Sequence, residues 1–155
     1  DQIVLDLVHK DLRRGRAAGL SIIPTTTGAA KAIFEVIEGM EGKIDGVAFR
    51  VPVADASVVD LIVELDRDVT KEQVNDAFKK AANGKMKGVL EYTEEPIVSV
   101  DVIGNPHTAI VDGLSTMVLG EKSNLVKVLT FYDNEWAYSV ALVELFNLIA
   151  SKGFK

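Results

Sequence analysis

The spacing of apolar residues predicts regular elements over most of the chain. From Gly28 to Met40 apolar residues recur at helical spacing, and Thr27 is placed as the N-cap of the expected helix. Residues 46–53 and 57–65 each alternate with a period of two, which predicts strands. The connection between those strands is short, so they are expected to pair as antiparallel neighbours.

The second half of the chain continues with one helix, a series of strands and a final helix. Thr70 and Gln73 form a capping box, and the helix it opens is expected to end near Gly84. A final helix is expected at 135–152, with Gly153 as its stop. Its core stripe would be Tyr138, Leu142, Leu145, Phe146 and Ile149. Four apolar runs predict the strands at 88–93, 97–103, 108–118 (with a break at Gly113) and 125–132.

The first 26 residues follow neither period. Residues 1–26 therefore read as a long arm, and residues 27–155 as a body of sheet and helices. Consecutive strands are not strictly separated by helices. The expected class is α+β, with a largely antiparallel mixed sheet and about three helices packed on it.

Composition narrows the class of protein. The 155 residues carry a net charge of −6, which argues against a nucleic-acid-binding surface. There is no apolar run of about 20 residues, so no membrane partner is expected, and with no signal peptide seen the expected location is the cytoplasm. The chain contains no cysteine, which excludes disulfides, thiolate metal ligands and a cysteine nucleophile within these 155 residues. The first residue is not Met, as in a processed piece of a longer chain.

The residues themselves support an anion-binding surface. Thr27 and Gly28 stand at an expected helix start, where free backbone N–H groups can bind phosphate, although a simple capped helix explains them too. Arg50 lies in an otherwise apolar strand, either on a solvated face or reaching an anion site. The arm carries Arg14 within a basic cluster that could complete such a site.

Other chemistries find less support. His9 and His107 are far apart and have no ligand at metal-binding spacing, so no metal site is expected. Asn134 lies where a strand ends and a helix begins, a usual place for a ligand-facing residue, but a helix cap explains it equally well. No G-x-G-x-x-G follows a strand, so the chain has no dinucleotide-binding fold of its own.

Ordered motifs across the whole chain resemble a known family. They include HKDLRRGRAA, SIIPTTTGAAKAI, GVAFRVPV, SVVDLIVEL, GNPHTAIVDGLSTMV and LVKVLTFYDNEWAYS. In this order they are similar to the catalytic domain of glyceraldehyde-3-phosphate dehydrogenase, most closely to the bacterial or organellar type. The resemblance implies an NAD-dependent, phosphorylating oxidation of glyceraldehyde 3-phosphate through a cysteine thioester. It also implies that the Rossmann half, the catalytic cysteine and the catalytic histidine precede Asp1, so none of them is in this chain.

The resemblance assigns roles residue by residue. For substrate and inorganic phosphate it implies Asp1, Arg14, Thr27, Gly28 and Arg50. For the cofactor it implies that Asn134 holds the nicotinamide carboxamide and that Tyr138 packs near it. The arm resembles the S-loop that lines a neighbouring subunit's cofactor pocket, which implies a homo-oligomer.

The chain also departs from the family pattern. Ile3 and Val8 stand where Arg and Pro are usual, Ala137 replaces Gly, and Val140 and Ala141 replace a polar residue and an Arg. Either sequence drift or redesign of a surface would explain these changes. Two functions therefore stay open, beside a third, a phosphate-binding module. One is a fragment of the glycolytic dehydrogenase that is inactive alone and active with a complementary N-terminal half. The other is a non-catalytic scaffold or oligomerisation module, natural or engineered, that uses this fold.

Overall fold

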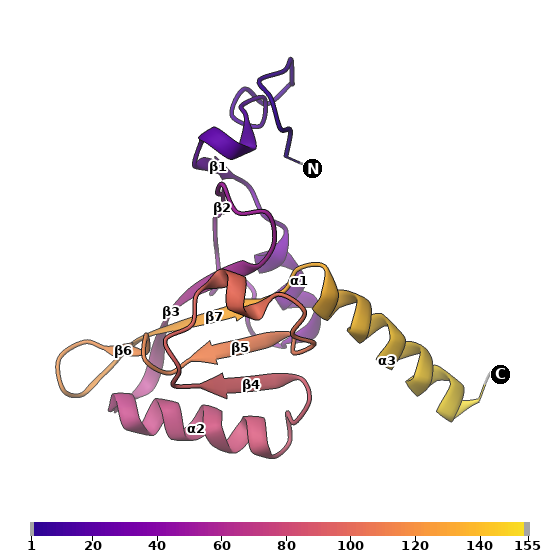
Figure 1. Cartoon of the computed structure of the whole chain (residues 1–155). Helices are drawn as coiled ribbons and strands as arrows, with labels where there is room; N and C mark the ends of the chain where they lie inside the picture. Colours follow the sequence, from indigo (N-terminus) through magenta and orange to yellow (C-terminus); the bar gives the residue numbers. More distant parts are fainter. Residues whose placement is uncertain (1, 154–155) are drawn as a thin grey trace. The chain divides into compact units, whose positions relative to one another are not determined.

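The computed structural model describes residues 2–153 and divides into two compact units, Asp1–Ala54 and Asp55–Lys155. The elements of the first unit, in chain order, are the 3-10 helix η1 (Ala18–Leu20), β1 (Ile23–Thr25), α1 (Ala29–Val36) and β2 (Ala48–Arg50) (Figure 1).

A short antiparallel ladder organises the first unit. β1 pairs with β2, with Ile23 opposite Arg50 and Thr25 opposite Ala48. The expected pairing of residues 46–53 with residues 57–65 is therefore wrong. Alternation predicts a strand but does not select its partner, and residues 57–64 pair instead with residues 125–132. The end of the arm supplies the partner strand, which the sequence pattern did not indicate.

The arm before β1 is a loop with its own hydrogen bonds. The backbone N–H of Leu7 donates to the Gly15 carbonyl at 3.0 Å, and the N–H of Ala17 donates to Asp6 Oδ1 at 2.7 Å. Gly15 is buried, and a Cβ there would lie 2.9 Å from the carbonyl oxygen of Leu7. A glycine at this position is what allows the two passages of the loop to approach so closely.

Helix α1 is shorter than the apolar spacing predicted. It ends at Val36. Its N-cap is Gly28, and Thr27, the expected N-cap, lies one residue before that position. The Thr27 hydroxyl nevertheless accepts the N–H of Ala29 at 3.1 Å. The expected apolar face is largely open, since Val36 is 80% exposed and Ile37 is 50% exposed.

The second unit is built on a five-stranded sheet. Its strands are β3 (Ser57–Val69), β4 (Leu90–Thr93), β5 (Ala109–Asp112), β6 (Met117–Val118) and β7 (Ser123–Tyr132). The order is β3-β7-β5-β4, and β6 pairs with β7 (Figure 1). All pairs are antiparallel except β4 with β5. The chain has three α-helices within residues 2–153, so the α+β class and the largely antiparallel mixed sheet are confirmed.

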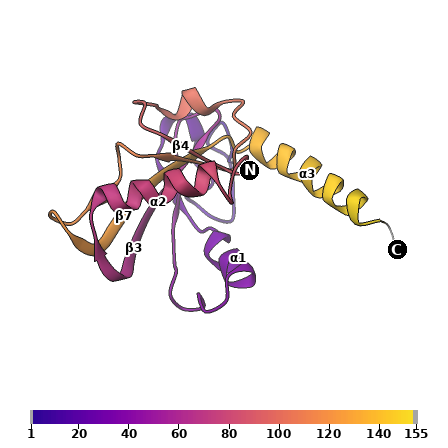
Figure 2. The same cartoon turned by 90° about the horizontal axis from the view of Figure 1, so that it is seen from below.

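Different segments cover the two faces of this sheet. Helix α2 (Lys71–Asn83) lies along β4 and packs Val74 and Phe78 on a buried cluster (Figures 1 and 2). That cluster consists of Val69, Leu90, Val111, Val126 and Val128. Side chains alternate across a strand, so Ile110 faces the opposite side, where it lines a cavity together with Val102.

The ends of α2 confirm the sequence prediction. The Thr70 hydroxyl accepts the N–H of Gln73 at 3.3 Å, and the Gln73 side chain accepts the N–H of Thr70 at 3.0 Å. The helix stops at Gly84, which is its C-cap. This end of the fold is therefore encoded locally, by the reciprocal bonds of the capping box.

The segment 97–103 is not the strand that its apolar residues predicted. It contains the 3-10 helix η2 (Ser99–Val102), and Asp101 Oδ2 accepts the N–H of Val98 at 2.7 Å. Gly104, with a φ of 82°, then turns the chain. A short apolar run fits strand and helix equally well, and here a local carboxylate cap favours the helical turn.

The final helix α3 (Trp136–Lys152) begins one residue later than predicted and has the predicted end at Lys152 and stop at Gly153. Its expected core stripe is wrong, because Tyr138 is 67% exposed and Phe146 is 66% exposed. In both views α3 runs away from the sheet (Figures 1 and 2). Only Ala137, at its start, is buried.

Asp133 joins β7 to α3. Its side chain is buried, at 2% exposure, and its carboxylate accepts N–H groups from Gly104 at 2.7 Å, Glu135 at 2.8 Å and Trp136 at 2.7 Å. Hydrogen bonds to the ionised form, chiefly from Gly104 and then Trp136, hold the pKa of Asp133 below its usual range, against the opposing effect of burial.

Gly113→Ala is expected to lower the free energy of unfolding by about 1–3 kcal/mol, because overpacking displaces neighbouring atoms. An added Cβ would overlap the ring of Tyr92. Urea denaturation measures the change, and a double-mutant cycle with Tyr92→Ala identifies its source. If Gly113→Ala costs as much in the Tyr92→Ala background, the collision is not the cause.

Asp133→Asn is expected to lower the melting temperature at pH 7, because an amide replaces one of two accepting oxygens with a donor. The pKa of Asp133 is depressed in the folded state, so its stabilisation is complete above the unfolded-state pKa. It is lost as the pH falls below about 4. Thermal unfolding of the wild type and of Asp133→Asn is measured from pH 7 to pH 3. The difference between their melting temperatures should become smaller as the pH falls. A difference in melting temperature that does not change with pH would contradict the stabilising role of the ionised Asp133 carboxylate.

Candidate functional site

The ladder of the first unit brings two predicted phosphate residues to one small framework. Arg50 lies on β2 opposite Ile23 of β1. The guanidinium of Arg14 donates through Nε to the Thr25 hydroxyl, two residues further along β1, at 2.7 Å. Thr25 is buried, so its hydroxyl is a fixed acceptor. Ile23 and Thr25 face the same side of the strand. Arg50, opposite Ile23, and Thr25, which holds Arg14, are therefore diagonal neighbours on that side.

Asp11 holds the turn that carries Arg14. Asp11 Oδ1 accepts the backbone N–H groups of Arg13 at 2.9 Å and Arg14 at 3.3 Å. These bonds, that of Arg13 first, lower the pKa of Asp11. Its other oxygen, Oδ2, is 3.9 Å from Arg14 Nε, so the carboxylate also faces the guanidinium. The position of Arg14 is thus set from both sides, by Asp11 and by Thr25.

Thr27 and Gly28 lie between β1 and the start of α1. Both are exposed, and a Cβ built on Gly28 would meet no atom within 4 Å. Open space beside the first N–H groups of a helix is compatible with an approaching anion. Together with the two arginines, this gives the first unit cationic and hydroxyl groups suited to phosphate. Asp1, the remaining candidate of this set, lies outside the described residues.

The two cofactor candidates lie in the second unit, where β7 passes into α3. The exposed side chain of Asn134 accepts a hydrogen bond from the Ser57 hydroxyl, with 3.0 Å between Oγ and Oδ1. Tyr138 is one turn further along α3 and largely exposed. An exposed amide can hydrogen-bond a heteroaromatic amide, and an exposed aromatic ring can stack on one.

Sequence reasoning missed two residues of these sites. In the sequence, Thr25 stands just before an expected helix start and Ser57 is the first residue of an expected strand, and neither position indicates a further role. Their hydroxyls are nevertheless the partners of Arg14 and Asn134. The Thr-Thr-Thr run offered a signal for Thr25, since more hydroxyls stand there than one helix cap requires. Ser57 had no such signal, because its partner is 77 residues away.

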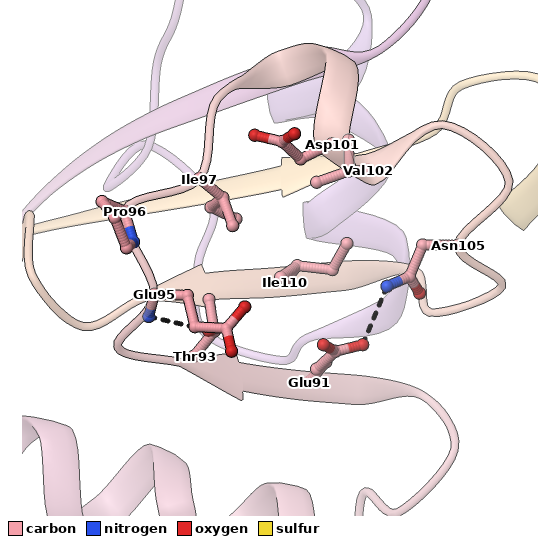
Figure 3. Close-up of a pocket in the computed structure, with 9 residues that line it drawn as sticks. All are labelled: Glu91, Thr93, Glu95, Pro96, Ile97, Asp101, Val102, Asn105 and Ile110. Carbon is pink, nitrogen blue, oxygen red and sulfur yellow. Dashed lines mark hydrogen bonds between the residues drawn. The ribbon is translucent and has the colours of Figure 1, made fainter.

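A separate cavity of about 360 Å³ opens on the face of the sheet that η2 covers (Figure 3). Carboxylates of Glu91, Glu95 and Asp101 line it beside apolar Val102 and Ile110. Two of these carboxylates already have structural partners. Glu91 Oε2 accepts from Asn105 Nδ2 at 2.8 Å and lies 2.9 Å from His107 Nδ1, while Asp101 caps η2. None of the predicted site residues lines this cavity.

Two kinds of feature are absent from residues 2–153, a metal-binding cluster and a helix able to cross a bilayer. No group of three or more His, Asp or Glu side chains there is arranged to hold a metal ion. No helix in the same range combines the length and the apolar character that crossing a bilayer requires.

Comparison with known proteins assigns the family. Residues 1–134 match the family described as glyceraldehyde 3-phosphate dehydrogenase, C-terminal domain. The chain is 55% identical to glyceraldehyde-3-phosphate dehydrogenase 2 of Bacillus subtilis, over 98% of this chain and 44% of that protein. It is 56% identical to the glyceraldehyde-3-phosphate dehydrogenase of Geobacillus stearothermophilus, over 99% of this chain and 45% of the relative.

The enzyme of Streptomyces coelicolor is 58% identical, over 94% of this chain and 43% of that relative. The chain thus spans less than half the length of the curated relatives that it matches. The match covers both units, from the arm to the junction of β7 with α3. The chain belongs to the glyceraldehyde 3-phosphate dehydrogenase C-terminal domain family.

Proposed function

We propose that this chain is the C-terminal part of a cytoplasmic, NAD-dependent, phosphorylating glyceraldehyde-3-phosphate dehydrogenase of glycolysis. The observation that carries the proposal is the identity of 55% to a glyceraldehyde-3-phosphate dehydrogenase over 98% of the chain. Its substrates are then glyceraldehyde 3-phosphate and inorganic phosphate. Both are phosphate-bearing, and the arginines and hydroxyls of the first unit are suited to such groups.

The proposed phosphate-binding residues are Asp1, Arg14, Thr27, Gly28 and Arg50. Arg14 and Arg50 supply charge-assisted hydrogen bonds, and the Arg14 Nε–Thr25 bond keeps one guanidinium in a fixed direction. The Thr27 hydroxyl and the N-terminal N–H groups of α1 add neutral donors. Asp1 is included on the family resemblance alone.

The proposed cofactor-binding residues are Asn134 and Tyr138. Their fit rests on an exposed amide held by Ser57 and on an exposed aromatic ring four residues further along the chain. NAD, when bound, accepts the hydride of the oxidation. Asn134 would hold the nicotinamide carboxamide and thereby orient the ring, while Tyr138 would restrict its movement and exclude water from one side.

The chain alone is proposed to be inactive. A thioester requires a thiolate nucleophile within reach of its base, and the 155 residues include no cysteine. The chain would instead contribute phosphate and cofactor contacts to a centre whose nucleophile and general base come from the other part of the protein.

The exposed apolar surface supports a need for partners. Helix α3 presents Val143, Leu145, Phe146 and Leu148, each at least 49% exposed, and these residues lie on more than one side of the helix. The edge strand β3 exposes Val58 and Ile62. Surfaces of this kind are usually interfaces, and unprotected strand edges favour association. We assign them to a complementary N-terminal half and to further copies in a homo-oligomer.

A second candidate is a non-catalytic scaffold or oligomerisation module, and the feature that favours it is Val8 of the arm. Val8 replaces a residue that is usually Pro and is fully exposed. Ile3, Val140 and Ala141 are each half-buried within this chain. In this candidate, a stable oligomer of the chain alone would form without any dehydrogenase activity.

Mixing the chain with the part of the Bacillus subtilis relative that it does not match tests the leading proposal. NADH formation from glyceraldehyde 3-phosphate, NAD and phosphate is expected in the mixture and in neither component alone. Replacing the cysteine nucleophile in the added part should abolish the activity. A tightly associated mixture without activity would contradict the dehydrogenase proposal, and a stable homo-oligomer of the inactive chain would then favour the scaffold.

Arg50→Ala is expected to weaken binding of inorganic phosphate to the chain about tenfold or more, since a hydrogen bond from a charged group contributes about 1.5–3 kcal/mol. Titration calorimetry measures the affinity. Arg67→Ala is the matched control, because it removes the same charge from an exposed position on β3. If both variants lose the same affinity for phosphate, the loss comes from the change in net charge, and Arg50 is not a phosphate-binding residue.

A further inference from the structure

We propose that Ser57 is a positioning residue that fixes the direction of the Asn134 side-chain amide. The hydroxyl holds the amide oxygen on the side of Ser57, so that the amide nitrogen is the group available to a ligand. The ligand group that matches is a carbonyl oxygen. The inference rests on the proposed function, because it specifies how Asn134 would meet the nicotinamide carboxamide.

The geometry places the Ser57 hydroxyl on one side of the amide. Ser57 is the first residue of β3 and lies opposite Tyr132, the last residue of β7. Asn134 follows two residues later, and Ser57 Oγ lies 3.0 Å from its Oδ1. The contact therefore depends on the register of the β3–β7 ladder, which is the longest pairing in the sheet.

Glu135 determines which end of the amide faces Ser57. A serine hydroxyl can donate or accept, so by itself it would tolerate either orientation of an asparagine. The Glu135 carboxylate, which only accepts when ionised, lies on the other side, with 3.5 Å between Asn134 Nδ2 and Glu135 Oε1. Reversing the amide would place its oxygen against this carboxylate. Glu135 thus favours nitrogen on its own side and leaves the oxygen to Ser57.

The backbone on both sides of this contact is held in place. Asp133, directly before Asn134, is buried and accepts three backbone N–H groups. Ala56, directly before Ser57, has a φ of 77°, which is rare for a residue other than glycine. Its N–H donates to Asp55 Oδ1 at 2.7 Å. A strained residue persists only where its surroundings determine it, so the approach of Ser57 is set by the fold.

The consequence is selectivity for the ligand's acceptor. The amide nitrogen of Asn134 carries two N–H groups, and the Glu135 contact uses at most one of them. The other can donate to the carbonyl of a nicotinamide carboxamide. An unrestrained asparagine would present its oxygen part of the time and would lose that hydrogen bond.

The first test uses the chain alone and needs no activity. The side-chain amide of Asn134 is observed by nitrogen-15 NMR in the wild type, in Ser57→Ala and in Ser57→Thr. We expect a restrained amide in the wild type and in Ser57→Thr, and a shifted, mobile one in Ser57→Ala. Ser151→Ala is the matched control, because it removes a serine hydroxyl at the far end of α3. An Asn134 amide equally restrained in Ser57→Ala would overturn the proposal.

The second test uses the active mixture with the complementary part. Ser57→Ala is expected to raise the KM for NAD about 2–10-fold, the range of one hydrogen bond, with a smaller change in kcat. Ser57→Thr should restore the KM, and Ser151→Ala should not change it. The acetylpyridine analogue of NAD keeps the carbonyl but lacks the amide N–H groups, so the wild-type mixture should bind it nearly as well as NAD.

The outcomes separate the two claims. No activity in the wild-type mixture would refute the proposed function, while the NMR comparison would still decide the role of Ser57. An active mixture with equal KM values for NAD in the wild type and in Ser57→Ala would refute the role of Ser57 and leave the function intact. Strong discrimination against the acetylpyridine analogue by the wild type would show that Asn134 offers its oxygen, and would also refute the proposal.

Discussion

Strand β7 is the element on which the second unit depends. It pairs with β3, β5 and β6, and it contributes Val126 and Val128 to the buried cluster under α2. It also determines where α3 begins, because Asp133 follows it directly and caps the helix. The same carboxylate binds Gly104 and so connects this junction to the loop after η2. A shift in the register of β7 would therefore disturb the core and displace Asn134 together.

Each unit places its candidate site at the end of a strand pairing. In the first unit, the ladder of β1 and β2 brings Arg50 close to the threonine that holds Arg14. In the second, the ladder of β3 and β7 brings Ser57 to Asn134. Paired strands give such side chains fixed positions, which loops alone provide less well. In both sites a hydroxyl orients the functional group, which is half-buried Arg14 in the first unit and exposed Asn134 in the second.

Local signals in the sequence predicted local structure well. The capping box of Thr70 and the stop at Gly153 involve neighbours in the chain, and both were correct. Long-range choices could not be predicted in this way. The alternation in residues 46–53 and 57–65 fitted several partners, and the strand that pairs with β2 was hidden in the arm. The apolar residues of α3 indicated burial, but the described part of this chain leaves most of them exposed.

The proposed function makes α3 an interface helix, whose apolar sides would be covered only when the rest of the protein is present. Hydrogen exchange of the α3 amides, with and without the complementary part of the Bacillus subtilis relative, tests this directly. In the isolated chain, α3 should exchange much faster than β7 and become protected on mixing. If α3 is already as protected as β7 in the monomeric chain, and mixing changes nothing, the account is contradicted.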